Sequence, residues 1–174
     1  MSINVSPTGL ARDLIERQKA GRPIRIGLIG CGEMGTDIVT AVARMNGVEV
    51  GAVAERKIPA ALRAAEIAYG EGGHACEVES GAAMTAAMEA GRIAVTADAG
   101  LVVASERIDV VVDATGVPAV GAEIGLAAME HGKHLVMMNV EADVTIGAYL
   151  KAEAERLGVV YSLGAGDEPS ACME

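Results

Sequence analysis

Along most of the chain, short apolar runs alternate with longer segments in which apolar side chains recur at helical spacing. The run I-D-V-V-V-D at 108–113 is almost continuously β-branched, which is typical of a strand buried on both faces of a sheet. The predicted strands are 24–29, 48–53, 93–96, 108–113, 134–138 and 159–163. The predicted helices are 10–20, 33–45, 59–69, 82–90, 99–105, 118–131 and 145–157, the last with Thr145 as its N-cap. Because strands and helices alternate, the pattern predicts an α/β fold with a doubly wound parallel sheet.

A Gly-x-Gly-x-x-Gly turn joins the first predicted strand to the helix that follows it. Gly30 allows the tight turn, Gly32 leaves room for a pyrophosphate, and Gly35 lets the helix pack closely on the strand. The N–H groups of the first helical turn then face the phosphates, where the helix dipole favours anions. This strand–turn–helix context predicts a dinucleotide-binding βαβ unit of the Rossmann type, with Cys31, Glu33 and Met34 also in the cofactor loop.

We divide the chain into three segments, of which the middle one contains the glycine turn. We expect 1–22 to be an N-terminal helical arm, 23–168 an NAD(P)-binding domain, and 169–174 the start of a truncated following element. Gly72, Gly73 and His74 are predicted to lie in a loop within the domain. No segment comparable to a substrate domain follows, so we expect the chain to be a fragment or one part of a split enzyme.

The turn after the second strand holds the residues that discriminate between cofactors. Glu55 lies 20 residues after Gly35, the distance expected for a carboxylate that binds the adenosine ribose, and it would repel a 2′-phosphate. Arg56 and Lys57 favour the opposite outcome, since guanidinium and ammonium groups bind phosphate. A solvated charged turn is the third interpretation. The cofactor is therefore NADP or NAD, and we expect NADP to bind at least as well.

Further candidates follow the later strands, because ligands of a parallel sheet bind at the carboxyl ends of its strands. Ala114, Thr115 and Gly116 would lie beside the nicotinamide ribose, where Asn139 could bind the nicotinamide amide. The same strand end carries Glu141, a further cofactor contact. Asp167 and Glu168 could bind a divalent cation, Mg²⁺ or Mn²⁺, although solvation is the commoner explanation of an acidic pair. His131 and His134 fall at the opposite end of the sheet, so the catalytic acid is unknown.

Composition and charge narrow the function further. The chain has 174 residues, no Trp, no Phe and a formal net charge of −10, which argues against nucleic acid or an anionic membrane as partner. Neither a signal peptide nor a membrane-spanning run is evident, so we expect a cytoplasmic protein. The expected partners are a small-molecule substrate, bound through a missing or separate domain, and a second copy in a homo-oligomer. Cys31 is either a thiol with a lowered pKa at a helix N-terminus or a small side chain tolerated in the turn, and we favour the latter.

Several stretches resemble the cofactor domain of homoserine dehydrogenases between about 24 and 169. They are I-G-L-I-G-C-G-E-M-G, V-V-V-D-A-T-G, G-K-H-L-V-M-M-N-V-E and S-L-G-A-G-D-E-P. Homoserine dehydrogenases typically read G-K-H-V-V-T-A-N-K in the third stretch, whereas Val140 follows Asn139 here. Valine cannot transfer a proton, so this departure argues against homoserine oxidation.

The chain from Leu10 to Glu174 also resembles the bacterial deoxyxylulose-phosphate-reductoisomerase-like oxidoreductases. The resemblance includes G-E-M-G-T-D-I-V, N-V-E-A-D-V-T-I-G and Y-S-L-G-A-G-D-E-P-S. It implies an NADPH-dependent reductoisomerase that acts on a sugar phosphate, of the isoprenoid-precursor type, with a divalent metal. The alternatives are a non-catalytic dinucleotide-binding domain and a fragment of a homoserine- or semialdehyde-type dehydrogenase.

Overall fold

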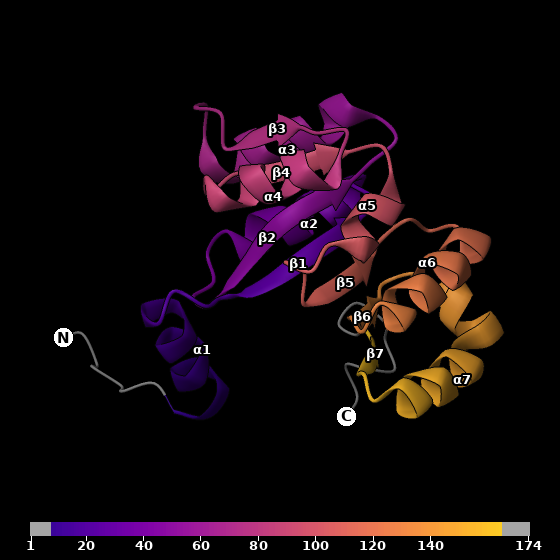
Figure 1. Cartoon of the computed structure of the whole chain (residues 1–174). Helices are drawn as coiled ribbons and strands as arrows, with labels where there is room; N and C mark the ends of the chain where they lie inside the picture. Colours follow the sequence, from indigo (N-terminus) through magenta and orange to yellow (C-terminus); the bar gives the residue numbers. More distant parts are fainter. Residues whose placement is uncertain (1–7, 165–174) are drawn as a thin grey trace.

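The computed structural model describes residues 8–164, and within them seven strands form one sheet (Figure 1). The strands are β1 (Ile24–Ile29), β2 (Val48–Ala54), β3 (Ala75–Glu77), β4 (Ile93–Thr96), β5 (Val110–Asp113), β6 (His134–Met137) and β7 (Tyr161–Leu163). Their order is β3-β4-β2-β1-β5-β6-β7, and every pair is parallel. The predicted doubly wound parallel sheet is therefore confirmed.

Helices cover both faces of the sheet and divide the core into two clusters. On one face, α2 (Glu33–Val42) and α3 (Ile58–Tyr69) pack on Leu28, Val53 and Val95. The other face is covered by α4 (Gly81–Glu89), α5 (Ala99–Ala104), α6 (Pro118–Glu130) and α7 (Val140–Leu157). Because successive strand residues point to opposite faces, the strands are apolar almost throughout.

The N-terminal helix α1 (Gly9–Lys19) lies apart from the layers, at the lower left of Figure 1, and none of its residues is buried. It is joined to the body at Gly47, whose N–H donates to the Gln18 side chain at 2.9 Å. Gly47 has a φ of 75°, and a Cβ there would overlap the Leu14 carbonyl. A glycine is therefore required where the arm touches the domain.

Two elements differ most from the sequence prediction. The short edge strand β3 directly follows the predicted loop at Gly72, Gly73 and His74, and it is absent from the predicted strands. The last helix begins at Val140 rather than at 145, because the Asn139 side chain accepts a hydrogen bond from the Ala142 N–H and caps it. Thr145 lies inside this helix, where its hydroxyl donates to the Glu141 carbonyl, so its prediction as the N-cap is wrong.

The order of the strands creates the crevice in which a ligand can bind. After β1, the chain forms β2, β3 and β4 on one side of β1. It then crosses back and forms β5 on the other side of β1. The loops after β1 and β5 therefore leave the sheet in opposite directions. Ligands of open parallel sheets bind at such a switch point, outside the carboxyl ends of the strands.

Candidate functional site

Each glycine of the turn after β1 meets a different steric requirement. Gly30 has a φ of 90°, and a Cβ there would lie 2.8 Å from the Ala114 carbonyl oxygen of the β5 loop. A Cβ on Gly35 would overlap the Gly30 carbonyl oxygen, so Gly35 brings α2 against the turn. Gly32 has open space where its Cβ would be. Two glycines thus shape the loop, and the third leaves its surface accessible.

The N-terminus of α2 begins at this open glycine. Gly32 is the N-cap, and in the described part of the chain no side chain accepts a hydrogen bond from the first turn. The first N–H groups of a helix lack intrahelical partners, and the helix dipole adds positive potential there. An anionic group that approached Gly32 would meet these donors directly.

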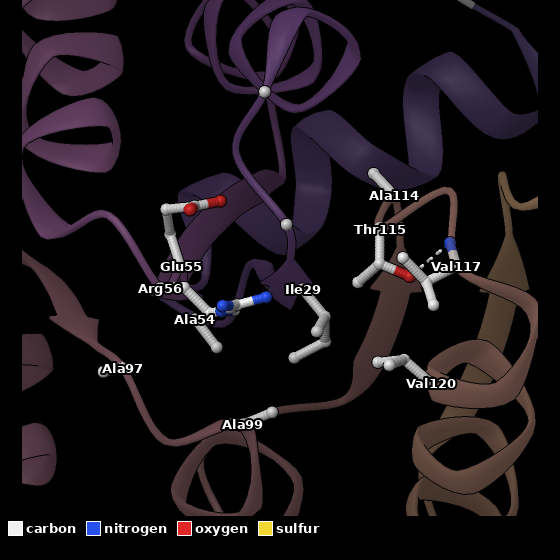
Figure 2. A pocket seen from close by; sticks show the side chains of 12 residues that line it. Ile29, Ala54, Glu55, Arg56, Ala97, Ala99, Ala114, Thr115, Val117 and Val120 are labelled. Carbon is white, nitrogen blue, oxygen red and sulfur yellow. Dashed lines mark hydrogen bonds between the residues drawn. The ribbon is translucent and has the colours of Figure 1, made fainter.

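A cavity of about 340 Å³ lies beside this turn (Figure 2). The ends of four neighbouring strands line it, through Gly30 after β1, Glu55 after β2, Ala97 after β4 and Thr115 after β5. Val117 and Val120 form the wall opposite Glu55 and Arg56. The cavity lies at the switch point, with the charged side chains of Glu55 and Arg56 at one end and the apolar side chains of Val117 and Val120 at the other.

At the charged end, Glu55 and Arg56 behave differently. One carboxylate oxygen of Glu55 accepts from the Cys31 N–H at 2.8 Å, and the other accepts from the Lys57 N–H at 2.8 Å. Glu55 is half-buried, whereas Arg56 is exposed and extends its guanidinium into the pocket toward Ile29 in Figure 2. Both residues lie at the cavity, as the sequence analysis expected. The two hydrogen bonds that hold Glu55 were not predicted.

The β5 and β6 ends carry a buried polar cluster. Asp113 is 0% exposed, and its carboxylate accepts from the Thr115 N–H at 3.1 Å and from the Asn139 amide at 3.2 Å. The Asn139 amide also donates to the Thr115 hydroxyl at 3.4 Å, while its oxygen accepts from the Ala142 N–H at 3.2 Å. Asn139, predicted to bind nicotinamide, is thus already bonded to its neighbours. The sequence analysis missed Asp113, although an acidic residue that ends a β-branched run is a signal for it.

The remaining cofactor candidates occupy three kinds of position. Glu33 and Met34 are exposed in the first turn of α2, and Gly116 is exposed in the β5 loop with a φ of 63°. Glu141 is exposed in the first turn of α7 and does not line the cavity. Cys31 is buried beneath the turn, where burial above all, and then the charge of Glu55, raises its pKa to about 11. The alternative of a lowered pKa for this thiol is therefore wrong, because desolvation outweighs the hydrogen bond with Thr36, which lowers the pKa.

Metal ligands and histidines give no support for catalysis at the cavity. Across residues 8–164, no three His, Cys, Asp or Glu side chains are grouped so that they could hold a metal ion. Asp167 and Glu168 lie outside the described residues. His131 ends α6 and His134 begins β6, so both lie at the amino end of the sheet, as predicted.

Among residues 8–164, the helices are all too short or too polar to span a membrane.

The sheet order, the glycine turn and the cavity at the switch point together define a Rossmann-type nucleotide-binding domain. Residues 30–163 match the family model described as homoserine dehydrogenase, NAD binding domain. The chain belongs to this family. A homoserine dehydrogenase from Methylobacillus glycogenes is 33% identical over 118 residues, which are 68% of this chain and 25% of that protein.

Solved structures show the same fold in oxidoreductases. A homoserine dehydrogenase from Thiobacillus denitrificans superposes with a TM-score of 0.58 at 22% identity, over 82% of this chain and 29% of the other. A 3-ketoreductase from Actinomadura kijaniata, in complex with NADP, gives 0.60 at 23% identity, over 82% and 38%. A scyllo-inositol dehydrogenase from Lactobacillus casei, with bound NAD(H), gives 0.56 at 19%, over 82% and 36%. The chain thus spans between a quarter and two-fifths of these relatives.

Proposed function

We propose that this chain is the cofactor-binding part of an NAD(P)-dependent oxidoreductase. The observation that carries the proposal is the open surface of Gly32, which lies in the cavity wall and immediately before the uncapped first turn of α2. A dinucleotide pyrophosphate needs such a combination of free N–H donors and space for close backbone approach. The family membership supports the same cofactor class.

For the whole enzyme, we propose a reductoisomerase-like reaction on a sugar phosphate, supported by a divalent cation. The support is the sequence resemblance together with Val140, which occupies the first position of α7 where homoserine dehydrogenases have a lysine. The family match equally supports a homoserine- or semialdehyde-type dehydrogenase, which is the second candidate. Asp167 and Glu168 are the proposed cation ligands.

The proton donor and the substrate contacts belong, in this proposal, to residues other than those around the cavity. Asn139 is engaged with Asp113, and both histidines of the β6 region are at the far end of the sheet. Hydride transfer requires a substrate held at about 3–3.5 Å from the nicotinamide and shielded from water. We therefore expect the 174-residue chain to bind cofactor without turning it over. A chain whose function is to bind the cofactor without catalysing a reaction would be a non-catalytic dinucleotide-binding domain.

Binding of NADH and NADPH, followed by calorimetry, tests the cofactor role. We expect the wild-type chain to bind at least one of them, and Gly32→Val to abolish binding because the side chain fills the space for the pyrophosphate. Gly81→Val is the matched control, since Gly81 also stands in open space, at the first residue of α4 and away from the cavity. Circular dichroism should be unchanged in both variants. Equal affinity in the wild type and Gly32→Val would contradict the proposal.

A further inference from the structure

The N-terminal helix α1 is a formed helix that the rest of the domain does not cover. It has 11 residues, none of them buried, and it makes no extensive contact with another helix or strand of the described residues. An isolated helix of this length is marginal in water, because most helical stability in proteins comes from the packing of an apolar face. Packing against a further surface would supply the stability that α1 lacks.

The position of α1 is nevertheless fixed by the turn before β2. The Gln18 side chain accepts from the Gly47 N–H at 2.9 Å, and the Ile24 N–H donates to the Gly47 carbonyl at 2.8 Å. One turn thus holds both ends of the segment that links α1 to β1, and α1 projects from the domain at a defined place (Figure 1). Leu14 is half-buried at this junction, whereas Leu10, one helical turn further out, is 73% exposed.

The arm segment 9–22 also differs from the rest of the chain in charge. It carries four basic and two acidic side chains, a net charge of +2, within a chain whose net charge is −10. Arg12 is paired with its neighbour Asp13, but Arg17 and Lys19 have no hydrogen bond or ion pair among the described contacts. An apolar and acidic surface would therefore complement the exposed side of α1.

A groove with these properties lies between α4 and α5, on the face of the sheet opposite α2 and α3. Its volume is about 450 Å³, and its lining includes the apolar side chain of Leu101 and the carboxylate of Glu106. Residues 77–107, which contain both helices, have a net charge of −3. Arg107 at the groove is paired with Glu89, whereas Glu106 is exposed and has no such partner among the described contacts.

We propose that α1 of one copy of this chain docks into the groove between α4 and α5 of a second copy, with Leu10 in the groove and the basic side chains of α1 beside Glu106. Both complementary surfaces belong to the same chain, but α1 is held at the start of β2 and lies apart from α4 and α5 in Figure 1. In a two-fold dimer each arm occupies the groove of the other copy, so both surfaces are covered at once. The proposal goes beyond the cofactor function and does not depend on it.

Analytical ultracentrifugation of the full chain tests this arrangement. The wild type should be a dimer, and Leu10→Asp should weaken it at least about tenfold, because a charge then replaces the apolar side chain that enters the groove. Ala104→Arg, which fills the groove from an exposed position on α5, should weaken the dimer to a similar extent. Val144→Asp is the matched control, since Val144 is 80% exposed on α7, and it should leave the dimer intact.

Mixing the two weakened variants separates this arrangement from other dimers. The Leu10→Asp chain keeps an intact groove and the Ala104→Arg chain keeps an intact arm. The mixture should therefore regain dimer through one arm–groove contact, while neither variant dimerises alone. Circular dichroism shows whether each variant is folded, and Leu10→Ser and Ala104→Gln carry the same test if a charge perturbs the fold.

Four results would overturn the proposal. They are a monomeric wild type, a dimer that survives Leu10→Asp, a dimer that is lost in Leu10→Asp but unchanged in Ala104→Arg, and a mixture of the two variants that regains no dimer. The third result would mean that α1 docks elsewhere on the second copy. Screening supplies an independent check, because raised salt should weaken a contact between a basic arm and an acidic groove. A dimer that is insensitive to salt would contradict the charge complementarity.

Discussion

The two ends of the cavity use polar groups in opposite ways. At the β1–β2 end, backbone donors of the first turn of α2 lack a side-chain cap in the described residues, and Gly32 faces open space. At the β5–β6 end, Asp113, Thr115 and Asn139 are bonded to one another, and two of the three are buried. One end is preorganised for a ligand from outside, while the other is satisfied internally.

Under the proposed cofactor function, this difference indicates which half of a dinucleotide each end would hold. Free donors and steric space at the glycine turn suit the pyrophosphate, and Glu55 suits the adenosine ribose. The β5–β6 end presents the Thr115 hydroxyl and the apolar side chains of Val117 and Val120 to the cavity. Its polar cluster instead positions the β5 loop and caps α7. We therefore expect substitutions there to affect stability first, and those at the glycine turn to affect binding first.

The largest effect on stability is expected from Asn139→Ala. The substitution removes the amide donor to the buried Asp113 carboxylate and the N-cap acceptor of α7. Hydrogen bonds to charged groups contribute about 1.5–3 kcal/mol and an N-cap about 1 kcal/mol, so unfolding should become about 3 kcal/mol easier. Ser80→Ala removes only the cap of α4 and should cost about 1 kcal/mol. Urea denaturation of both variants measures the difference.

The same variant sharpens the comparison between the two ends when NADH and ADP-ribose are titrated separately. If the Asn139 amide serves only the buried cluster, both affinities stay within about twofold of wild type. A loss confined to NADH would mean that the amide turns to the nicotinamide when the cofactor binds, as the sequence analysis expected. The internally satisfied end would then be a binding surface after all.

A smaller effect is expected from Gly121→Ala in α6, which tests how tightly this helix covers the cluster. A Cβ at Gly121 would lie 2.5 Å from an Asp113 carboxylate oxygen and 2.8 Å from the Asn139 amide nitrogen. Overpacking of this kind costs about 1–3 kcal/mol, against a gain of up to about 1 kcal/mol in helix propensity. Gly81→Ala, in open space, should be neutral or slightly stabilising. The melting temperature should therefore fall in Gly121→Ala and stay unchanged or rise slightly in Gly81→Ala, and equal shifts would show that the cluster yields easily.

Local sequence patterns predicted the strand ends and the glycine turn well, because both depend on neighbours within a few residues. The partners that give Glu55 and Asn139 their roles are distant, at Cys31 and Asp113, 24 and 26 residues away in the sequence. Their pairing depends on strand order and register, which periodicity does not encode. The edge strand β3 was missed for another reason: its sequence Ala-Cys-Glu contains no β-branched or aromatic residue, whereas the equally short edge strand β7 lies in the predicted apolar run at 159–163. The unpredicted part of the site is thus the part made by tertiary contacts.

The smallest effect is expected from the pH dependence of Cys31, which lies beneath the open end of the cavity. Burial raises the pKa of its thiol from 9.0 to about 11, so the unfolded chain loses this proton first as the pH rises. The stability contributed by the neutral buried thiol is fully present below pH 9 and is lost as the pH approaches about 11. Cys31→Ser should therefore lose less stability than wild type over this window in urea denaturation, while the ionisation of Tyr69 and Tyr161 affects both chains alike. Parallel curves would mean that water reaches the thiol through the glycine turn. Water would then reach the inner side of the turn as well as its exposed side. The Cys31 N–H group that donates to the Glu55 carboxylate would not be buried.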